Sequence, residues 1–123
     1  MSCDNNQLTI AMRRGDYKKL SFLRHSYSGI VIQSEPQDIF FTVKTSNLVE
    51  DFIFQKKLSN NTITFDNQTC LYTFEILPED TNNLTYGDYK FDVEVLVSDN
   101  KKKTICYGTL KIRPEITWEV NEK

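Results

Sequence analysis

The chain has 123 residues, which suits one ordinary domain and is too short for two. Aromatic residues make up 12% of it while glycine and proline are scarce, which excludes a fibrous or low-complexity protein. The formal net charge of −2 comes from interspersed charges of both signs. This argues against a sequence-independent nucleic-acid binder, because such proteins present a dense basic patch to phosphates.

The hydrophobic period is two along most of the chain, which is typical of half-buried strands. In chain order, the alternation predicts strands over residues 7–12, 18–24, 38–45, 51–58, 62–65, 70–77, 88–98 and 104–112. Turn signals separate these segments, and no convincing helix is found between them. The pattern therefore predicts an all-β fold, a sandwich or barrel of antiparallel strands.

The turn after the first strand contains Arg14-Gly15-Asp16, a tripeptide that some host-cell receptors bind. Three-residue motifs are common by chance. We interpret this one as a turn in which Gly15 supplies a positive φ between two strands.

The connection before the longest strand, residues 78–89, resembles the tyrosine corner of Greek-key sandwiches. In such a corner a tyrosine hydroxyl bonds to the backbone a few residues upstream and fixes the crossover between sheets. Here Leu84 is expected to contact the core, Gly87 to take the tight turn, and Tyr89 to supply the hydroxyl. The three residues form a predicted structural corner, not an active site.

No constellation of residues points to catalysis. The single histidine, His25, lies beside a turn and has no catalytic motif around it. Glu79 and Asp80 lie in a predicted loop, where acidic side chains normally accept backbone hydrogen bonds. Clustered metal ligands and a phosphate-binding glycine loop are both missing from the sequence. We therefore predict a protein that is not an enzyme, with no catalytic residues, no cofactor and no metal.

Membrane insertion and secretion are not expected either. The sequence has no apolar run of 18 residues, and its polar first seven residues lack the apolar core of a signal peptide. The three cysteines, Cys3, Cys70 and Cys106, cannot all pair within one chain and match no zinc or redox spacing. We expect a cytoplasmic protein in which Cys70 and Cys106 are reduced core residues and Cys3 is reactive.

Several short motifs occur in an ordered set from about Leu8 to Thr117. They are Met-Arg-Arg-Gly-Asp at 12–16, Phe-Thr-Val-Lys at 41–44, Phe-Gln-Lys-Lys at 54–57, Pro-Glu-Asp-Thr at 78–81, Tyr-Gly-Asp-Tyr-Lys-Phe-Asp-Val-Glu at 86–94, Lys-Thr-Ile at 103–105 followed by Gly108 and Leu110, and Glu-Ile-Thr at 115–117. This layout resembles small structural proteins encoded in the tail and baseplate regions of phages and prophages of Gram-positive bacteria. It is more loosely similar to the N-terminal domain of phage baseplate upper proteins.

The resemblance implies an immunoglobulin-like antiparallel β-sandwich of about seven to eight strands and a non-enzymatic role in virion assembly. The expected partners are other virion proteins or copies of the chain itself, with no nucleic acid, membrane or small-molecule substrate. The expected location is the virion, assembled in the bacterial host cytoplasm.

Two alternatives stay open, since a fold does not fix a function. One is a stand-alone immunoglobulin-like module that binds carbohydrate or protein, which exposed aromatic residues at Tyr27, Tyr107 or Trp118 would favour. The other is a small hydrolase, which would need a pocket that holds His25 near two carboxylates.

The expected domain covers residues 1–117, and 118–123 form a C-terminal tail. The segment from Glu115 onwards alternates apolar and polar residues, with Ile116, Trp118 and Val120 on one side. Tryptophan is enriched at interface cores. We predict that these three residues either add to a neighbouring molecule or, for Trp118, fold back onto the domain itself.

Overall fold

The computed structural model describes residues 7–26, 28–46, 48 and 50–114. Over these residues the chain forms eight β-strands and one short helix. In chain order they are β1 (Gln7–Arg13), β2 (Lys18–Phe22), β3 (Asp38–Lys44), β4 (Phe54–Lys57), β5 (Ile63–Asp66), β6 (Leu71–Ile76), α1 (Pro78–Thr81), β7 (Gly87–Ser98) and β8 (Lys101–Arg113).

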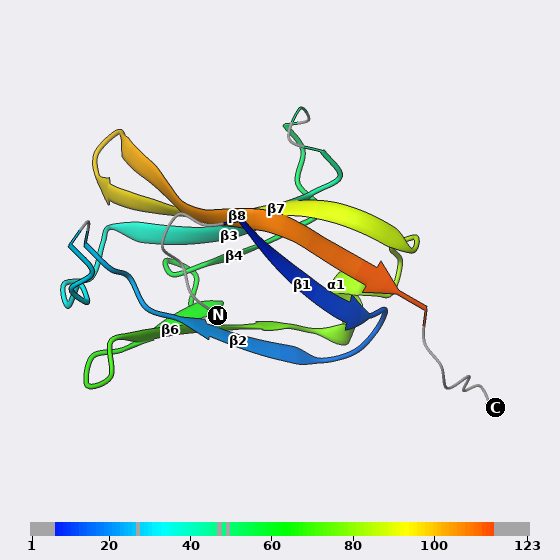
Figure 1. Cartoon of the computed structure of the whole chain (residues 1–123), viewed down its shortest axis with the longest axis horizontal. Helices are drawn as coiled ribbons and strands as arrows, with labels where there is room; N and C mark the ends of the chain where they lie inside the picture. Colours follow the sequence, from blue (N-terminus) through cyan, green and yellow to red (C-terminus); the bar gives the residue numbers. More distant parts are fainter. Residues whose placement is uncertain (1–6, 27, 47, 49, 115–123) are drawn as a thin grey trace.

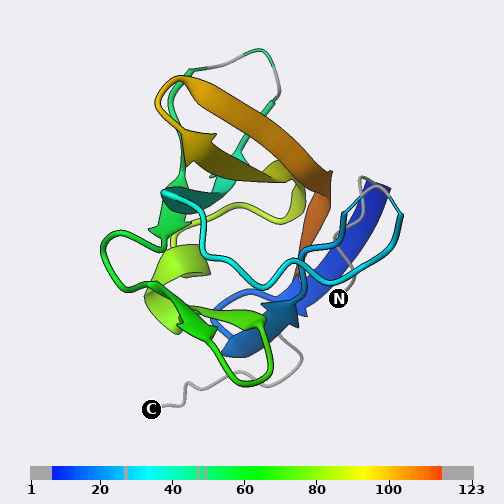
Figure 2. The same ribbon diagram turned by 90° about the vertical axis from the view of Figure 1, so that its left-hand side faces the viewer.

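The strands form two stacked sheets (Figure 1). The larger sheet has the order β1-β8-β7-β3-β4, and the smaller has the order β2-β6-β5. All neighbouring pairs are antiparallel except β1 and β8, which run parallel. The view turned by 90° shows β1 along one side of the molecule (Figure 2).

This strand order is that of an immunoglobulin-like sandwich. The neighbours β8, β7 and β3 correspond to strands G, F and C of immunoglobulin domains, and β2, β6 and β5 correspond to B, E and D. Strand β4 extends the larger sheet beyond β3, as the additional strands of variable-type domains do. The predicted immunoglobulin-like β-sandwich is confirmed. Its first strand departs from the constant-type arrangement, because it pairs with the last strand in parallel.

The core lies between the sheets, where the inward positions of the alternating strands meet. On β3 the side chains of Ile39, Phe41 and Val43 are fully buried. The ring of Phe41 lies 4.3 Å from that of Phe74 on the opposite sheet and 5.5 Å from that of Phe91, centroid to centroid. Aromatic rings from both sheets therefore pack together in this part of the core.

Several expectations about the elements need correction. Residues 78–81, expected to be non-helical, form the one-turn α1. The fourth strand begins at Phe54 rather than at residue 51, and Phe52, expected on its inner side, is 52% exposed. The last hairpin has a two-residue turn at Asp99 and Asn100, and the loop expected over 98–102 is mostly strand. The segment from 115 to 123 lies outside the described residues.

Candidate functional site

The predicted corner residues come together at the start of β7. The Tyr89 hydroxyl donates to the Thr85 carbonyl at 2.7 Å and lies 3.0 Å from the Thr85 hydroxyl. Leu84 is partly buried and packs against the core, while Gly87 has φ +144°, a conformation that favours glycine. A tyrosine at the start of this strand, bonded to backbone four residues upstream, has the geometry of a tyrosine corner.

The Arg14-Gly15 turn docks against the same connection. The Gly15 amide donates to the Thr81 hydroxyl at 2.8 Å, and Gly15 has φ +82°. The Arg14 guanidinium donates to the Leu84 carbonyl and to the Tyr86 hydroxyl, and it lies 4.4 Å from the Tyr86 ring centroid. The positive φ predicted for Gly15 is confirmed. Because the arginine is held by these bonds, the tripeptide acts here as a structural turn.

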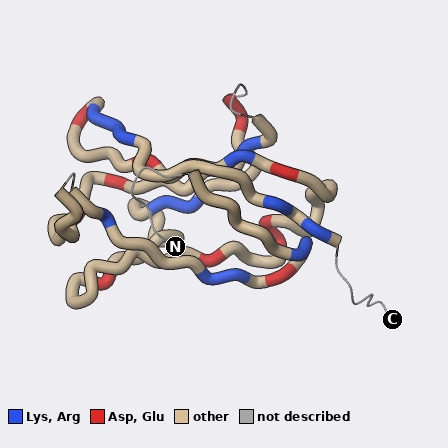
Figure 3. Tube along the Cα trace, in the orientation of Figure 1, with Lys and Arg blue, Asp and Glu red and all other residues tan. Residues whose placement is uncertain are grey.

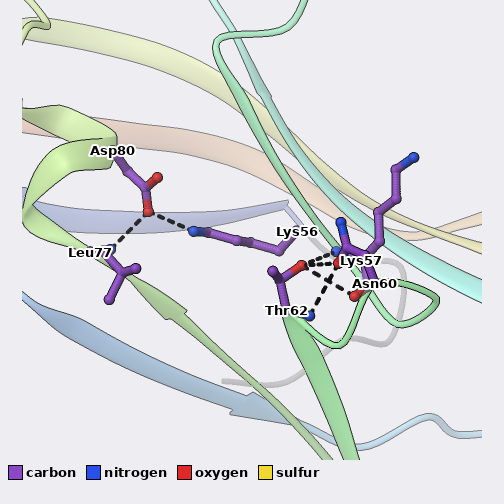
Figure 4. A network of polar contacts seen from close by, with 6 residues as sticks. All are labelled: Lys56, Lys57, Asn60, Thr62, Leu77 and Asp80. Carbon is purple, nitrogen blue, oxygen red and sulfur yellow. Dashed lines mark hydrogen bonds and ion pairs between the residues drawn. The ribbon is translucent and has the colours of Figure 1, made fainter.

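A buried ion pair joins β4 to the helical turn α1 (Figure 4). The Lys56 ammonium lies 2.7 Å from the Asp80 carboxylate, and the two side chains are only 9% and 14% exposed. The same carboxylate oxygen accepts the Leu77 amide at 2.8 Å. One signal for this contact is present in the alternation, because Lys56 falls on the inward positions of β4 together with Phe54.

Among the strands of the described residues, β1 is an edge of the larger sheet and pairs on one side only. Its pairing depends on Gly108, because a Cβ atom there would lie 1.8 Å from the Leu8 carbonyl oxygen. The Arg14 amide donates to the Arg113 carbonyl of β8. Since successive residues of a strand direct their backbone groups to opposite sides, Thr9 and Ala11 direct theirs to the open side.

The open edge of β1 carries little charge. The strand is uncharged from Gln7 to Met12, and both Thr9 and Ala11 are exposed. In Figure 3 the strand is tan over most of its length, while blue and red segments are scattered over the rest of the molecule. Natural proteins commonly protect a sheet edge with lysine, proline or a bulge. Strand β1 contains no lysine and no proline, and Arg13 at its end is its one charged residue.

The outer face of the larger sheet contains a shallow depression of about 270 Å³. Its lining residues come from β3, β7 and β8: Thr42, Lys44, Lys90, Phe91, Asp92, Thr104 and Tyr107. One row across the sheet places Tyr107 beside Asp92 and Asp92 beside Thr42. Tyr107 is 45% exposed, so its ring is accessible at this surface.

Asp92 is the unusual residue of this depression. Burial raises the pKa of its carboxyl group, repulsion from Glu94 raises it further, and Lys44 partly offsets the effect. The structure records no hydrogen bond or ion pair between this carboxylate and another described residue. Sequence reasoning missed Asp92, because it looks like any outward polar residue of an alternating strand.

The cysteines correct one prediction. Cys70 is a free, buried thiol, as expected. Cys106 is buried but disulfide-bonded, so the expectation of a reduced Cys106 is wrong. Cys3, which was expected to be reactive, lies outside the described residues. Composition and spacing gave no signal for this bond.

The remaining candidate residues have these positions. Ile116, Trp118 and Val120, the possible interface, lie outside the described residues, as does Tyr27. His25 forms an isolated bridge with Val31, and its Nδ1 atom is buried without a hydrogen-bond partner. Within the described ranges, no group of three or more His, Cys, Asp or Glu side chains could hold a metal ion. The same part of the chain contains no helix long and apolar enough to span a membrane.

Comparisons with known proteins give no family. No family model matches the chain, and no curated protein matches it. One similar solved structure comprises extracellular domains 3–5 of Drosophila OTK, with a TM-score of 0.36 and 15% sequence identity. The match covers 94% of this chain and 35% of that one, so the chain spans about a third of its length. The fold assignment rests on the strand order itself.

Proposed function

We propose that this chain is a non-enzymatic structural protein of a phage or prophage tail or baseplate. It assembles with copies of itself or with other virion proteins, and uses no nucleic acid, membrane or small-molecule substrate. The ordered motifs of the sequence support this proposal. The observation that carries it is the open, uncharged edge of β1, where the backbone groups of Thr9 and Ala11 point away from β8.

An unpaired strand edge invites pairing with another chain, because its amides and carbonyls gain partners there. Strand addition of this kind draws affinity from main-chain hydrogen bonds. The edge of β1 offers alternate residues with small exposed side chains, Thr9 and Ala11, and the opposite side chains are held in the core. An incoming strand therefore meets no bulky or charged side chain until Arg13.

The assembly proposal is tested by light scattering on the purified chain over rising concentration, alone and with proteins encoded by the adjacent genes. The variant Ala11→Pro removes one outward amide and leaves the β1–β8 hydrogen bonds intact. Ala11→Val keeps that amide and is the matched control. We expect wild type and Ala11→Val to assemble and Ala11→Pro to assemble less. Strictly monomeric wild-type protein under all of these conditions would contradict the proposal.

The segment from Glu115 onwards supplies a second variant. Deletion of residues 115–123 is expected to weaken assembly while the circular dichroism spectrum keeps its β character. If the deletion instead collapses the stability of a monomeric protein, Trp118 belongs to the core of its own domain and the predicted interface is wrong.

The disulfide of Cys106 bears on where assembly takes place. Disulfides are rare in cytosolic proteins. We propose that the protein is assembled in the host cytoplasm with a reduced Cys106. After the particle leaves the cell, dissolved oxygen oxidises this thiol and its partner thiol to the disulfide and is itself reduced to hydrogen peroxide. This order of events accounts for both the expected location and the observed bond.

A further inference from the structure

The depression on the outer face of the larger sheet has the groups of a small-ligand site. It combines the exposed ring of Tyr107, the carboxylate of Asp92, and two lysines paired across β3 and β7, Lys44 and Lys90. Ligand sites are concave, with an apolar surface and a few convergent polar groups. A volume of about 270 Å³ suits a single small ring rather than an extended chain.

The polar groups have defined roles as donors and acceptors. The Gln55 side-chain amide donates to the Thr42 hydroxyl at 2.9 Å, so the Thr42 hydroxyl is left to act as a donor itself. The ionised Asp92 carboxylate only accepts hydrogen bonds, and lysine only donates them. Hydroxyl groups, which both donate and accept, match this mixture.

The Asp92 carboxylate is half-buried, and the attraction of Lys44 partly offsets the rise in its pKa. No described side chain donates a hydrogen bond to it, so both of its oxygens can accept one from a ligand.

We infer that this depression binds one pyranose ring of a saccharide, with the ring stacked on Tyr107 and its hydroxyl groups bonded to Asp92. The aliphatic face of a sugar ring packs on an aromatic ring, and neighbouring hydroxyls donate to both oxygens of a carboxylate. Lys44 and Lys90 line the depression together with Asp92, so inorganic phosphate is the competing ligand that the test must exclude. The inference stands apart from the proposed assembly role, which uses a different part of the sheet.

The test is an NMR titration of ¹⁵N-labelled protein with the methyl glycosides of glucose, galactose and mannose, with N-acetylglucosamine, and with inorganic phosphate. We expect at least one sugar to shift backbone amides of β3, β7 and β8 around Thr42, Asp92 and Tyr107. Tyr107→Ala and Asp92→Asn should each weaken that binding by tenfold or more. No shift with any sugar, or shifts with phosphate alone, would overturn the inference.

Two controls separate binding from general effects. Tyr17→Ala removes another exposed tyrosine, which bonds Glu75 of the smaller sheet, and Asp99→Asn removes a carboxylate from the exposed hairpin turn. Both should leave the sugar affinity unchanged. Sugar binding that survives Tyr107→Ala and Asp92→Asn, in variants whose spectra show a folded protein, would also contradict the site.

Discussion

The hydroxyl of Tyr89 ties the connection between the sheets to the start of β7. Tyr89→Phe removes that hydroxyl and leaves the Thr85 carbonyl without its donor. The expected loss in the free energy of unfolding is about 0.5–1.5 kcal/mol, the net value of one hydrogen bond, because Thr85 is exposed and water can replace the lost donor. Denaturant melts of the variant and the wild type measure it.

Tyr17→Phe is the matched control, because the Tyr17 hydroxyl also makes a hydrogen bond, to Glu75 at 2.6 Å, but at an exposed position. Surface substitutions of this kind change stability little. A Tyr89→Phe melt that overlies both the wild type and this control would show that Tyr89 does not fix the corner.

The raised pKa of the Asp92 carboxyl group predicts that its ionised form lowers the stability of the domain at neutral pH. Its pKa in the folded state is raised above the ordinary value of 3.8, so the folded protein binds this proton more tightly than the unfolded chain does. Protonated Asp92 therefore contributes to stability, and this contribution is fully present below pH 3.8. It is lost as the pH rises through the folded-state pKa. We predict that Asp92→Asn is more stable than the wild type at pH 7.

The stability difference between Asp92→Asn and the wild type should shrink as the pH falls below the ordinary aspartate value. Urea melts of both proteins at the two pH values measure it, and Asp99→Asn controls for the loss of one exposed charge. An Asn variant less stable than the wild type at pH 7 would show that the carboxylate has a stabilising partner.

The ion pair between β4 and α1 acts at the scale of elements. Asp80→Asn leaves the buried Lys56 ammonium without its counter-charge, which should lower the free energy of unfolding by about 3–5 kcal/mol. The double variant Lys56→Met, Asp80→Asn removes both charges and should recover most of that loss, because a buried pair replaced by apolar groups is often neutral. Denaturant melts of the single and double variants check this. A double variant as unstable as the sum of the two single losses would argue against a direct pair.

The strands themselves were predictable from the sequence, because period-two alternation reports the pleat of a half-buried strand. Their pairing was not. The parallel contact of β1 with β8 depends on Gly108, whose lack of a side chain matters only once Leu8 is known to lie against it. Lys56 was passed over for a similar reason, since a lysine at an inward position is explained only by the carboxylate of Asp80.

The residues of the candidate sites also fall into two groups: those that the sequence alone locates and those that only the pairing of strands reveals. Leu84, Gly87 and Tyr89 could be located in the sequence because a tyrosine corner is a local device within a few residues. Asp92 could not be singled out, since its burial is created by Tyr107 and Thr42 on two other strands. At these positions sheet register, rather than residue type, decides the chemistry.

For the whole molecule, the cysteines test the proposed place of assembly. Protein unfolded in the presence of an alkylating reagent as the producing cells are lysed should carry a label on Cys106, whereas protein first exposed to air should not, because the disulfide then blocks this thiol. Cys70 should be slow to react in the folded state in both samples, because it is buried. A Cys106 already oxidised inside the cytoplasm would contradict the proposed order of events.

The central claim is that the molecule assembles through the open edge of β1. Hydrogen exchange at the amides of Thr9 and Ala11, measured in the monomer and in the assembly, tests it most directly, since these amides point away from β8. We predict fast exchange in the monomer and strong protection in the assembly, with the β8 amides protected in both. Amides at Thr9 and Ala11 that exchange equally fast in the assembled state would contradict the account.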